Sequence, residues 1–444
     1  MEKITLDMTG VLADAIGEPH GITAQEWDAM LPRLRTAQQR LCERHAMHQL
    51  GFAELPFDQA TVESILKVAQ QVRYRFDHVV VLGIGGSALG LRAMLEALLN
   101  PSVVMHDSLD RRSVPTLSIF DNVDPDAFVP GIQQLDWRMT CVNVVSKSGK
   151  TVETGAQWLI VRELLQKRFG SQRWKDHVIV TTDPATGPLR AMVICEGLRS
   201  FEVPPNVGGR FSALTPVALF PAACAGIDIA EMIAGAQAMA ERCFSEAIEE
   251  NSAAQLAGIH YLLDTAHQKS MAVMMPYAQA LRRFTDWYVQ LLAESLGKQG
   301  LGQTPIPAVG ATDQHSQLQL FVDGPNNKVV TIMTVAHHNC AVTIPHTDEP
   351  SFAFLGGHDM ATLLQGEAMA TRQSLQEAQR PTLHLQLPRL SPHTFGALLF
   401  CYEWHVALLG ELYGLNAFDQ PGVERGKQLT REHLRQQRPM PSVA

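Results

Sequence analysis

The stretch CVNVVSKSGKTVETGAQWLIVRELLQKRF, residues 141–169, decides the fold class of this chain. It opens with an apolar run typical of a buried strand and passes through a short polar turn. It then continues with the apolar spacing of a helix from residue 151 to residue 169. Glu153 lies in the first turn of this helix, where a carboxylate is favourable. A strand followed directly by a helix is the repeating unit of a parallel sheet covered by helices.

The polar turn in this stretch partly matches the pattern of a nucleotide-binding loop. It ends in Ser-Gly-Lys-Thr, which matches the last places of the pattern G-x-x-x-x-G-K-[ST]. The first place falls at Val144, and a β-branched residue there cannot form the tight curl that glycine allows. The turn still carries three hydroxyls, at Ser146, Ser148 and Thr151, beside Lys147. The stretch alone is compatible with a phosphate-binding site at a helix start and equally with a Ser/Thr helix cap beside solvated lysines.

The strand-and-helix alternation continues on both sides of this stretch. It predicts an α/β protein with two domains, each a mainly parallel sheet flanked by helices in an α-β-α sandwich. Strands are expected at residues 78–85, 115–120, 141–147 and 177–183, and again at 270–277, 328–335 and 381–387. Helices are expected at 87–99, 151–169, 187–197, 278–297, 360–379 and 391–413. A segment rich in Pro and Gly, 203–228, breaks the pattern and marks a connection between two lobes.

These patterns divide the chain into four parts. They are an N-terminal helical segment (1–55), a first domain (56–205), a second domain (206–412), and a C-terminal helix and tail (413–444). The end of the tail, 438–444, is expected to be loose.

Composition excludes several classes of protein. The chain has 444 residues and a net charge of −9 with no long basic run, which argues against nucleic-acid binding. Its seven cysteines are dispersed, as is typical of reduced thiols in a cytoplasmic protein. The N-terminus lacks the apolar core of a secretory signal. No uncharged apolar run reaches the roughly 20 residues that span a bilayer, so no membrane association is expected. The apolar stretch near 393–414 is expected to be a buried helix.

A second glycine-rich turn follows the strand at 78–85. Gly83, Gly85 and Ala88 satisfy a loose dinucleotide fingerprint, which leaves a nicotinamide-dependent dehydrogenase as an alternative. The acidic residue that should follow about 20 positions later would be Asp107, in a poor strand context. Ser87 also supplies a hydroxyl where a pyrophosphate prefers bare backbone. A compact phosphate site shared with the turn at 146–151 is therefore favoured.

Other polar side chains stand in short motifs further along the chain. Arg210, in NVGGRFS, is a permanent cation that can face an oxyanion, or it forms a surface ion pair. Glu294, in ESLGK, is a candidate general base, or it is merely solvated. His315 lies in a polar turn, and Gln420 and Lys427 lie at the start of the last helix. All three are candidate site residues, and a purely structural role is the alternative for each. No spacing typical of metal ligands occurs, so no metal is expected.

The joint order of these motifs is more specific than any one of them. GIGGS, SKSGKTVET, VGGRFS, ESLGK, TDQHSQLQ and FDQPGVERGK together resemble the phosphoglucose isomerase family from about residue 79 to residue 428. The resemblance implies two sugar-isomerase (SIS) domains. It implies reversible conversion of D-glucose 6-phosphate to D-fructose 6-phosphate through ring opening and a cis-enediolate. The family works without a cofactor, is cytoplasmic, and acts in glycolysis and gluconeogenesis.

The resemblance also implies a role for individual residues. Glu294 matches the base that shuttles a proton between carbons 1 and 2, and Arg210 with the Gly209 amide matches the groups that steady the enediolate. His315 and Lys427 match the pair implicated in ring opening. The histidine comes from the neighbouring subunit in the family, so a homodimer is expected. The positions that match substrate-binding residues are Gly86, Ser87, Ser146, Lys147, Ser148, Thr151 and Gln420, and Glu153 matches a structural position.

Two positions depart from the family pattern, and two related activities remain open. Lys150 stands where threonine is common, so it either strengthens phosphate binding or points to solvent. Leu296 replaces a polar residue and would make the surroundings of Glu294 less accessible to water.

A bifunctional glucose/mannose phosphate isomerase would share all the motifs. A non-catalytic sugar-phosphate sensor is the remaining alternative, but it would not need Glu294, His315 and Lys427 together.

Overall fold

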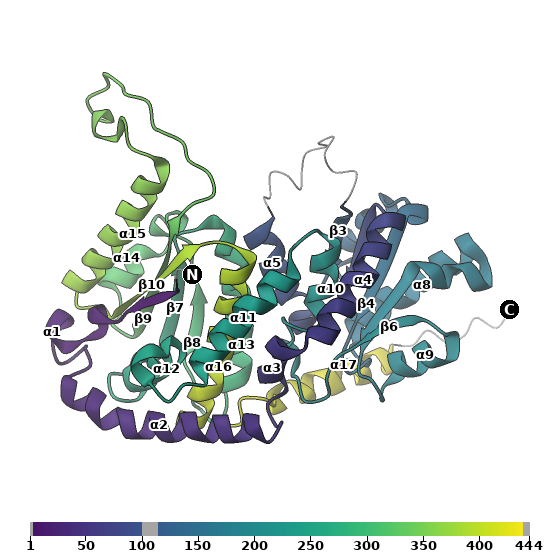
Figure 1. The fold of residues 1–444 in the computed structure, drawn as a ribbon, viewed down its shortest axis with the longest axis horizontal. Helices are drawn as coiled ribbons and strands as arrows, with labels where there is room; N and C mark the ends of the chain where they lie inside the picture. The colour runs from purple at the N-terminus through teal and green to yellow at the C-terminus, as the bar shows by residue number, and fades with distance from the viewer. Residues whose placement is uncertain (1–2, 100–113, 438–444) are drawn as a thin grey trace.

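Two five-stranded sheets form the centres of two lobes that lie side by side (Figure 1). The structure is a computed structural model that describes residues 3–99 and 114–437. Asp107 and the tail 438–444, considered above, lie outside the described residues. The expected α/β class with two mainly parallel, helix-covered sheets is confirmed.

The first sheet is parallel throughout and has the order β3-β2-β4-β5-β6. Its strands are β2 (His78–Leu82), β3 (Thr116–Phe120), β4 (Thr140–Val145), β5 (Val178–Thr182) and β6 (Arg199–Glu202). Every residue of β4 is buried, because helices cover both faces. One face packs on α4 (Gln59–Arg75), α5 (Leu89–Leu98) and α10 (Pro216–Cys224). The other packs on α7 (Pro125–Gln133), α8 (Val152–Arg173) and α9 (Pro188–Glu196).

The second sheet has the order β1-β10-β9-β7-β8, and only β1 runs antiparallel to its neighbour. Its strands are β1 (Thr5–Asp7), β7 (Met271–Pro276), β8 (Thr304–Pro307), β9 (Lys328–His337) and β10 (Thr382–Arg389). Helices α14 (Leu318–Asp323) and α15 (Met360–Glu377) cover one face. The helices on the other side are α2 (Ala24–Ala46), α11 (Ile229–Cys243), α12 (Ser252–Thr265), α13 (Arg282–Leu296) and α16 (Pro392–Tyr413).

The sequence-based expectation lacked several elements, among them β6, α4, α7, α11 and α12, and three further features differ from it. The expected helical segment 1–55 does contain α2, but it also supplies β1, which is too short to show an alternating pattern. The strand β8 was missed because two prolines interrupt it, and an edge strand tolerates them. The connection between lobes holds the fully buried helix α10, which packs against α4 and α5. The proposed domain boundaries remain a prediction.

The helix α16 is buried, as its apolar sequence predicted, and packs chiefly against α11, α12, α2 and α13. Its length and composition would suffice to cross a membrane, yet 94% of its apolar window is buried inside the fold. Across the lobe boundary, α5 packs against α13, which carries Glu294. The two lobes therefore share one continuous apolar core.

One carboxyl group inside α16 makes stability depend on pH. Glu403 is fully buried, and neither carboxylate oxygen has a hydrogen-bond partner within residues 3–99 and 114–437. Burial raises the pKa of Glu403 well above its ordinary value of 4.5. The unfolded chain then loses a proton at lower pH than the folded chain does. The stability that this group contributes is therefore fully present below its unfolded pKa and declines as pH rises toward the folded pKa.

We expect Glu403→Gln to remove this decline. The difference in unfolding free energy between variant and wild type should rise by at least about 1 kcal/mol in favour of the variant from about pH 5 to about pH 8. Urea unfolding at both pH values measures this difference. Glu246→Gln, which changes an exposed carboxyl, is the control and should show no such gain. An equal difference between variant and wild type at both pH values would contradict the prediction.

Candidate functional site

The two predicted phosphate-binding segments lie at the carboxyl ends of two neighbouring strands of the first sheet. β2 and β4 are neighbours, while β3 lies on the other side of β2, so the chain changes direction between their carboxyl ends. Open parallel sheets bind ligands at such a point. The turn Gly85–Ser87 follows β2 and precedes α5, and the turn 146–151 follows β4 and precedes α8. The structure thus places both segments at the carboxyl ends of two neighbouring parallel strands.

The turn after β4 is held by its own hydroxyls. The Ser146 and Thr151 hydroxyl oxygens lie 2.7 Å apart, and the Lys150 backbone N–H donates to the Ser148 hydroxyl at 3.2 Å. Ser148 and Lys150 are exposed, whereas Ser146 is buried. The hydroxyls therefore line a turn at the start of α8 with its backbone amides.

Lys147 connects this turn to the VGGRFS segment. Its ammonium donates to the backbone carbonyls of Pro205 at 2.6 Å and Val207 at 2.7 Å. Burial lowers the pKa of Lys147, with a smaller opposing effect of Asp183. The expected substrate-lining lysine thus holds the neighbouring loop in place in this structure.

The glycines of GIGGS and VGGRFS lie in direct backbone contact. A Cβ atom added to Gly86 would lie 2.2 Å from the Gly209 carbonyl oxygen, so a side chain there would force the two turns apart. The Ser212 hydroxyl donates to the Gly209 carbonyl at 2.7 Å. Gly85 has a φ of +58°, which favours glycine. The contact fixes the Gly209 amide beside the end of β2.

Arg210 and Glu294 form the charged centre of the site. Their Nη1 and Oε2 atoms are 3.5 Å apart, and the side chain of Arg210 is 2% exposed while that of Glu294 is 26% exposed. Burial lowers the pKa of Arg210, and Glu294 opposes that effect. Arg210 also donates to the Ser295 hydroxyl at 2.7 Å and to Gln420 Oε1 at 3.0 Å. A buried cation beside a partly exposed carboxylate can stabilise negative charge next to a base.

Two residues of the site were missed in the sequence. Ser295 is fully buried beside Arg210, and Gln290 donates from Nε2 to Glu294 Oε2 at 3.2 Å. A Cβ on Gly85 would lie 3.2 Å from Gln290 Nε2, so this amide stands between the glycine turn and Glu294. The spacing of four residues between Gln290 and Glu294 on one helix was a usable signal. Leu296, one of the departures, is fully buried at the end of α13.

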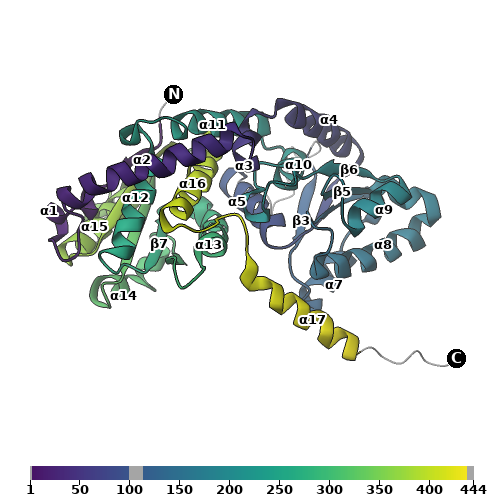
Figure 2. The ribbon, with the colours of Figure 1, turned by 90° about the horizontal axis from the view of Figure 1, so that it is seen from below.

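Both residues of the predicted ring-opening pair lie exposed on the surface of the chain. His315 is exposed after the short turn Thr312–Gln314. Lys427 is exposed on α17 (Glu424–Gln436) and pairs with Glu424 at 2.7 Å. Figure 2 shows α17 extending away from the two lobes. In the described part of the chain, the hydrogen bond and the ion pair of Glu294 go to Gln290 and Arg210, and not to His315 or Lys427.

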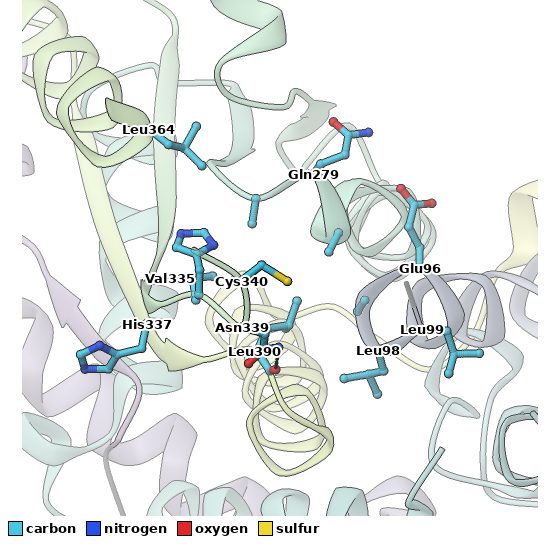
Figure 3. Close-up of a pocket in the computed structure, with 14 residues that line it drawn as sticks. Glu96, Leu98, Leu99, Gln279, Val335, His337, Asn339, Cys340, Leu364 and Leu390 are labelled. Atoms are coloured by element: carbon cyan, nitrogen blue, oxygen red, sulfur yellow. Dashed lines mark hydrogen bonds between the residues drawn. The ribbon is translucent and has the colours of Figure 1, made fainter. Parts of the chain in front are cut away.

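The carboxyl ends of the strands in the second lobe carry different side chains. A pocket of about 440 Å³ lies at the carboxyl ends of β7 and β9, where that sheet also changes direction (Figure 3). Its lining includes Gln279, Val335, Asn339, Cys340 and Leu364, and none of its described lining residues carries a hydroxyl. After β7, the short turn Gln279–Leu281 has the sequence Gln-Ala-Leu where the turn after β2 has Gly-Gly-Ser. The phosphate-binding interpretation therefore applies to the first lobe.

The chain matches known proteins over most of its length. The family model described as phosphoglucose isomerase matches residues 67–443. Glucose-6-phosphate isomerase of Carboxydothermus hydrogenoformans is 44% identical over 417 residues, with 91% of this chain and 89% of that protein covered. Glucose-6-phosphate isomerase of Rubrobacter xylanophilus is 42% identical over 419 residues, with 92% and 94% covered.

Solved structures agree with this match. A hypothetical protein of Thermus thermophilus has a TM-score of 0.85 at 36% identity, with 97% of this chain and 100% of that chain covered. A glucose-6-phosphate isomerase of Chlamydia trachomatis shares the fold, with a TM-score of 0.77 at 23% identity and coverage of 93% and 87%. Fold and site together define a sugar-phosphate isomerase built on two mainly parallel sheets covered by helices. The chain belongs to the phosphoglucose isomerase family.

Proposed function

We propose that this chain catalyses the reversible isomerisation of D-glucose 6-phosphate and D-fructose 6-phosphate. The observation that carries the proposal is the Arg210–Glu294 pair, 3.5 Å apart, beside the backbone contact of Gly86 and Gly209. Membership of the family and the names of the relatives support the choice of substrate. Those names mention glucose-6-phosphate isomerase alone, which does not favour the bifunctional glucose/mannose alternative.

The phosphate anchors one end of the substrate. The Gly86 amide and the hydroxyls of Ser87, Ser146, Ser148 and Thr151 bind it at two helix starts, with Lys147 and Gln420 nearby along the sugar. Binding energy from this remote group holds the carbon chain in position for reaction.

The proton transfer then takes place at Glu294. Its carboxylate removes the proton next to the carbonyl and returns it to the adjacent carbon. Arg210 and the Gly209 amide offset the charge of the enediolate between the two steps. Because Arg210 is already held by Ser295 and Gln420, it needs little rearrangement when that charge develops.

His315 and Lys427 open the sugar ring, and His315 acts in the site of a second subunit of a cytoplasmic homodimer. The exposed position of His315 supports this arrangement. So does α17, which has no buried residue. The loop between β9 and α15 also carries Phe352 and Phe354, which are 59% and 71% exposed and are suited to cover by a second copy.

Nuclear magnetic resonance of the purified protein with fructose 6-phosphate in D2O, without metal or nucleotide, tests the proposal. Glucose 6-phosphate carrying deuterium at carbon 2 is the expected product. Mannose 6-phosphate in the same spectrum would support the bifunctional alternative. Absence of turnover by folded, dimeric protein would overturn the isomerase assignment and favour a sensor, and turnover that requires nicotinamide would favour a dehydrogenase.

We expect Ser148→Ala to weaken substrate binding without slowing the chemical step. The exposed hydroxyl lies in the phosphate turn, and a hydrogen bond to a charged group contributes about 1.5–3 kcal/mol, so KM should rise about 10-fold or more. Steady-state kinetics with fructose 6-phosphate measure the effect. Ser171→Ala, an exposed serine at the other end of α8, is the matched control. An unchanged KM would mean that Ser148 does not bind the phosphate.

A further inference from the structure

The segment that follows α16 forms a strap across Arg210. The Nη2 atom of Arg210 donates to the carbonyl oxygens of Ala417 and Asp419, the latter at 2.9 Å. Gln420 accepts from Nη1 of the same guanidinium. Three contacts of Arg210 therefore depend on where residues 417–420 lie, and the position of Arg210 against Glu294 depends on them.

A salt bridge fixes this strap to the helix that carries Glu294. Lys298 follows α13 by two residues, and its ammonium lies 2.7 Å from Asp419 Oδ1. The ammonium also donates to the Asn416 carbonyl, and Asn416 Nδ2 donates to Asp419 Oδ2 at 2.9 Å. The pKa of Asp419 is lowered chiefly by its hydrogen bond to Lys298.

The strap has a second attachment that does not involve charge. The ring of Phe418 lies 5.3 Å from that of Phe211 and 5.9 Å from that of Phe52, measured between centroids. Leu415 and Ala417 are buried. Apolar packing therefore keeps the segment folded. The Lys298–Asp419 bridge fixes the position of those residues in it that contact Arg210.

We propose that Lys298 and Asp419 are positioning residues, which hold Arg210 at its working distance from Glu294 by tying residues 416–420 to the end of α13. The inference rests on the proposed function and adds to it two residues that do not contact the reacting atoms. The side chain of Lys298 is 11% exposed and that of Asp419 is 52% exposed. Solvent screens the half-exposed Asp419 carboxylate, which limits the contribution of the bridge to stability. We therefore assign the bridge a role in geometry.

Lys298→Met and Asp419→Asn test the inference by steady-state kinetics and thermal melting. Misplacing a catalytic group by a fraction of its contact distance is costly, so kcat should fall about 10- to 100-fold in each variant. KM should stay within about twofold, because the phosphate turn is untouched. Lys298→Arg should retain most of kcat, since a guanidinium also binds the carboxylate. The control is Lys167→Met, which breaks the exposed Lys167–Glu163 pair on α8.

The double variant separates a shared role from two independent ones. Because both residues act through one bridge, Lys298→Met combined with Asp419→Asn should lower kcat no more than the worse single variant does. Multiplying losses would overturn the inference, as would a kcat for both single variants equal to that of Lys167→Met. If Lys298→Met fails to fold, the half-exposed Asp419→Asn carries the test. The wild type is assayed in parallel, so lack of turnover there would count against the proposed function instead.

Discussion

Glu294→Gln is expected to abolish isomerisation while leaving the sugar phosphate bound. The substitution keeps the size of the side chain, and its amide oxygen can still accept the hydrogen bond from Gln290 Nε2. What it removes is the ability to take a proton from carbon. General base catalysis contributes about 10²–10⁴-fold, so kcat should fall by at least that amount. Exchange of the carbon-bound proton with D2O should fall in parallel.

Binding of a hexitol 6-phosphate, measured by calorimetry, separates chemistry from anchoring. This ligand lacks the carbonyl, so it reports the phosphate turn and not the reaction. Its affinity for Glu294→Gln should lie within about threefold of the wild-type value, because the anchoring residues are unchanged. Asp286→Asn, a change on the same helix, is the control for α13. Loss of hexitol phosphate binding would show that Glu294 holds the site together instead of acting as its base.

The sequence predicted several parts of the fold in which one segment carries a complete pattern. The stretch 141–169 became β4 and α8 as expected, because a buried parallel strand and a long helix each have their own periodicity. β1 has three residues, and only its pairing with β10 makes it a strand. Short elements such as β1 thus owe their structure to distant partners, which no local window contains. The helices α4 and α11 carry a local helical pattern and were missed although that pattern was available.

The same distinction applies to the site. The order of the motifs pointed to Arg210 and Glu294, and the structure places them 3.5 Å apart. Ser295 and Asp419 have no motif signal of their own as partners of Arg210, since those contacts arise only when α13 and the segment after α16 meet. Lys147 shows that a predicted site residue can have other partners. Its charge indicated a contact with the substrate, but in the structure its ammonium donates to two backbone carbonyls.

Two inactive variants should restore activity to each other when their subunits mix. If His315 serves the site of the neighbouring subunit, a dimer of one Glu294→Gln chain and one His315→Ala chain contains one site with both residues intact. Random exchange makes half the dimers hybrid, so about a quarter of the wild-type activity should return. Each variant alone should remain nearly inactive. Activity before and after mild dissociation and reassembly of an equimolar mixture measures the effect.

The pair Glu294→Gln and Arg210→Met supplies the matched control, because these two residues touch within one chain. A hybrid of those variants has one defect in each site, so mixing should restore nothing. Restoration in the first mixture and not in the second would place His315 across the interface. If both mixtures stay inactive although mass spectrometry finds the hybrids, then His315 must reach Glu294 of its own chain. In this structure His315 is exposed, and the hydrogen-bond and ion-pair partners of Glu294 in the described part of the chain are Gln290 and Arg210.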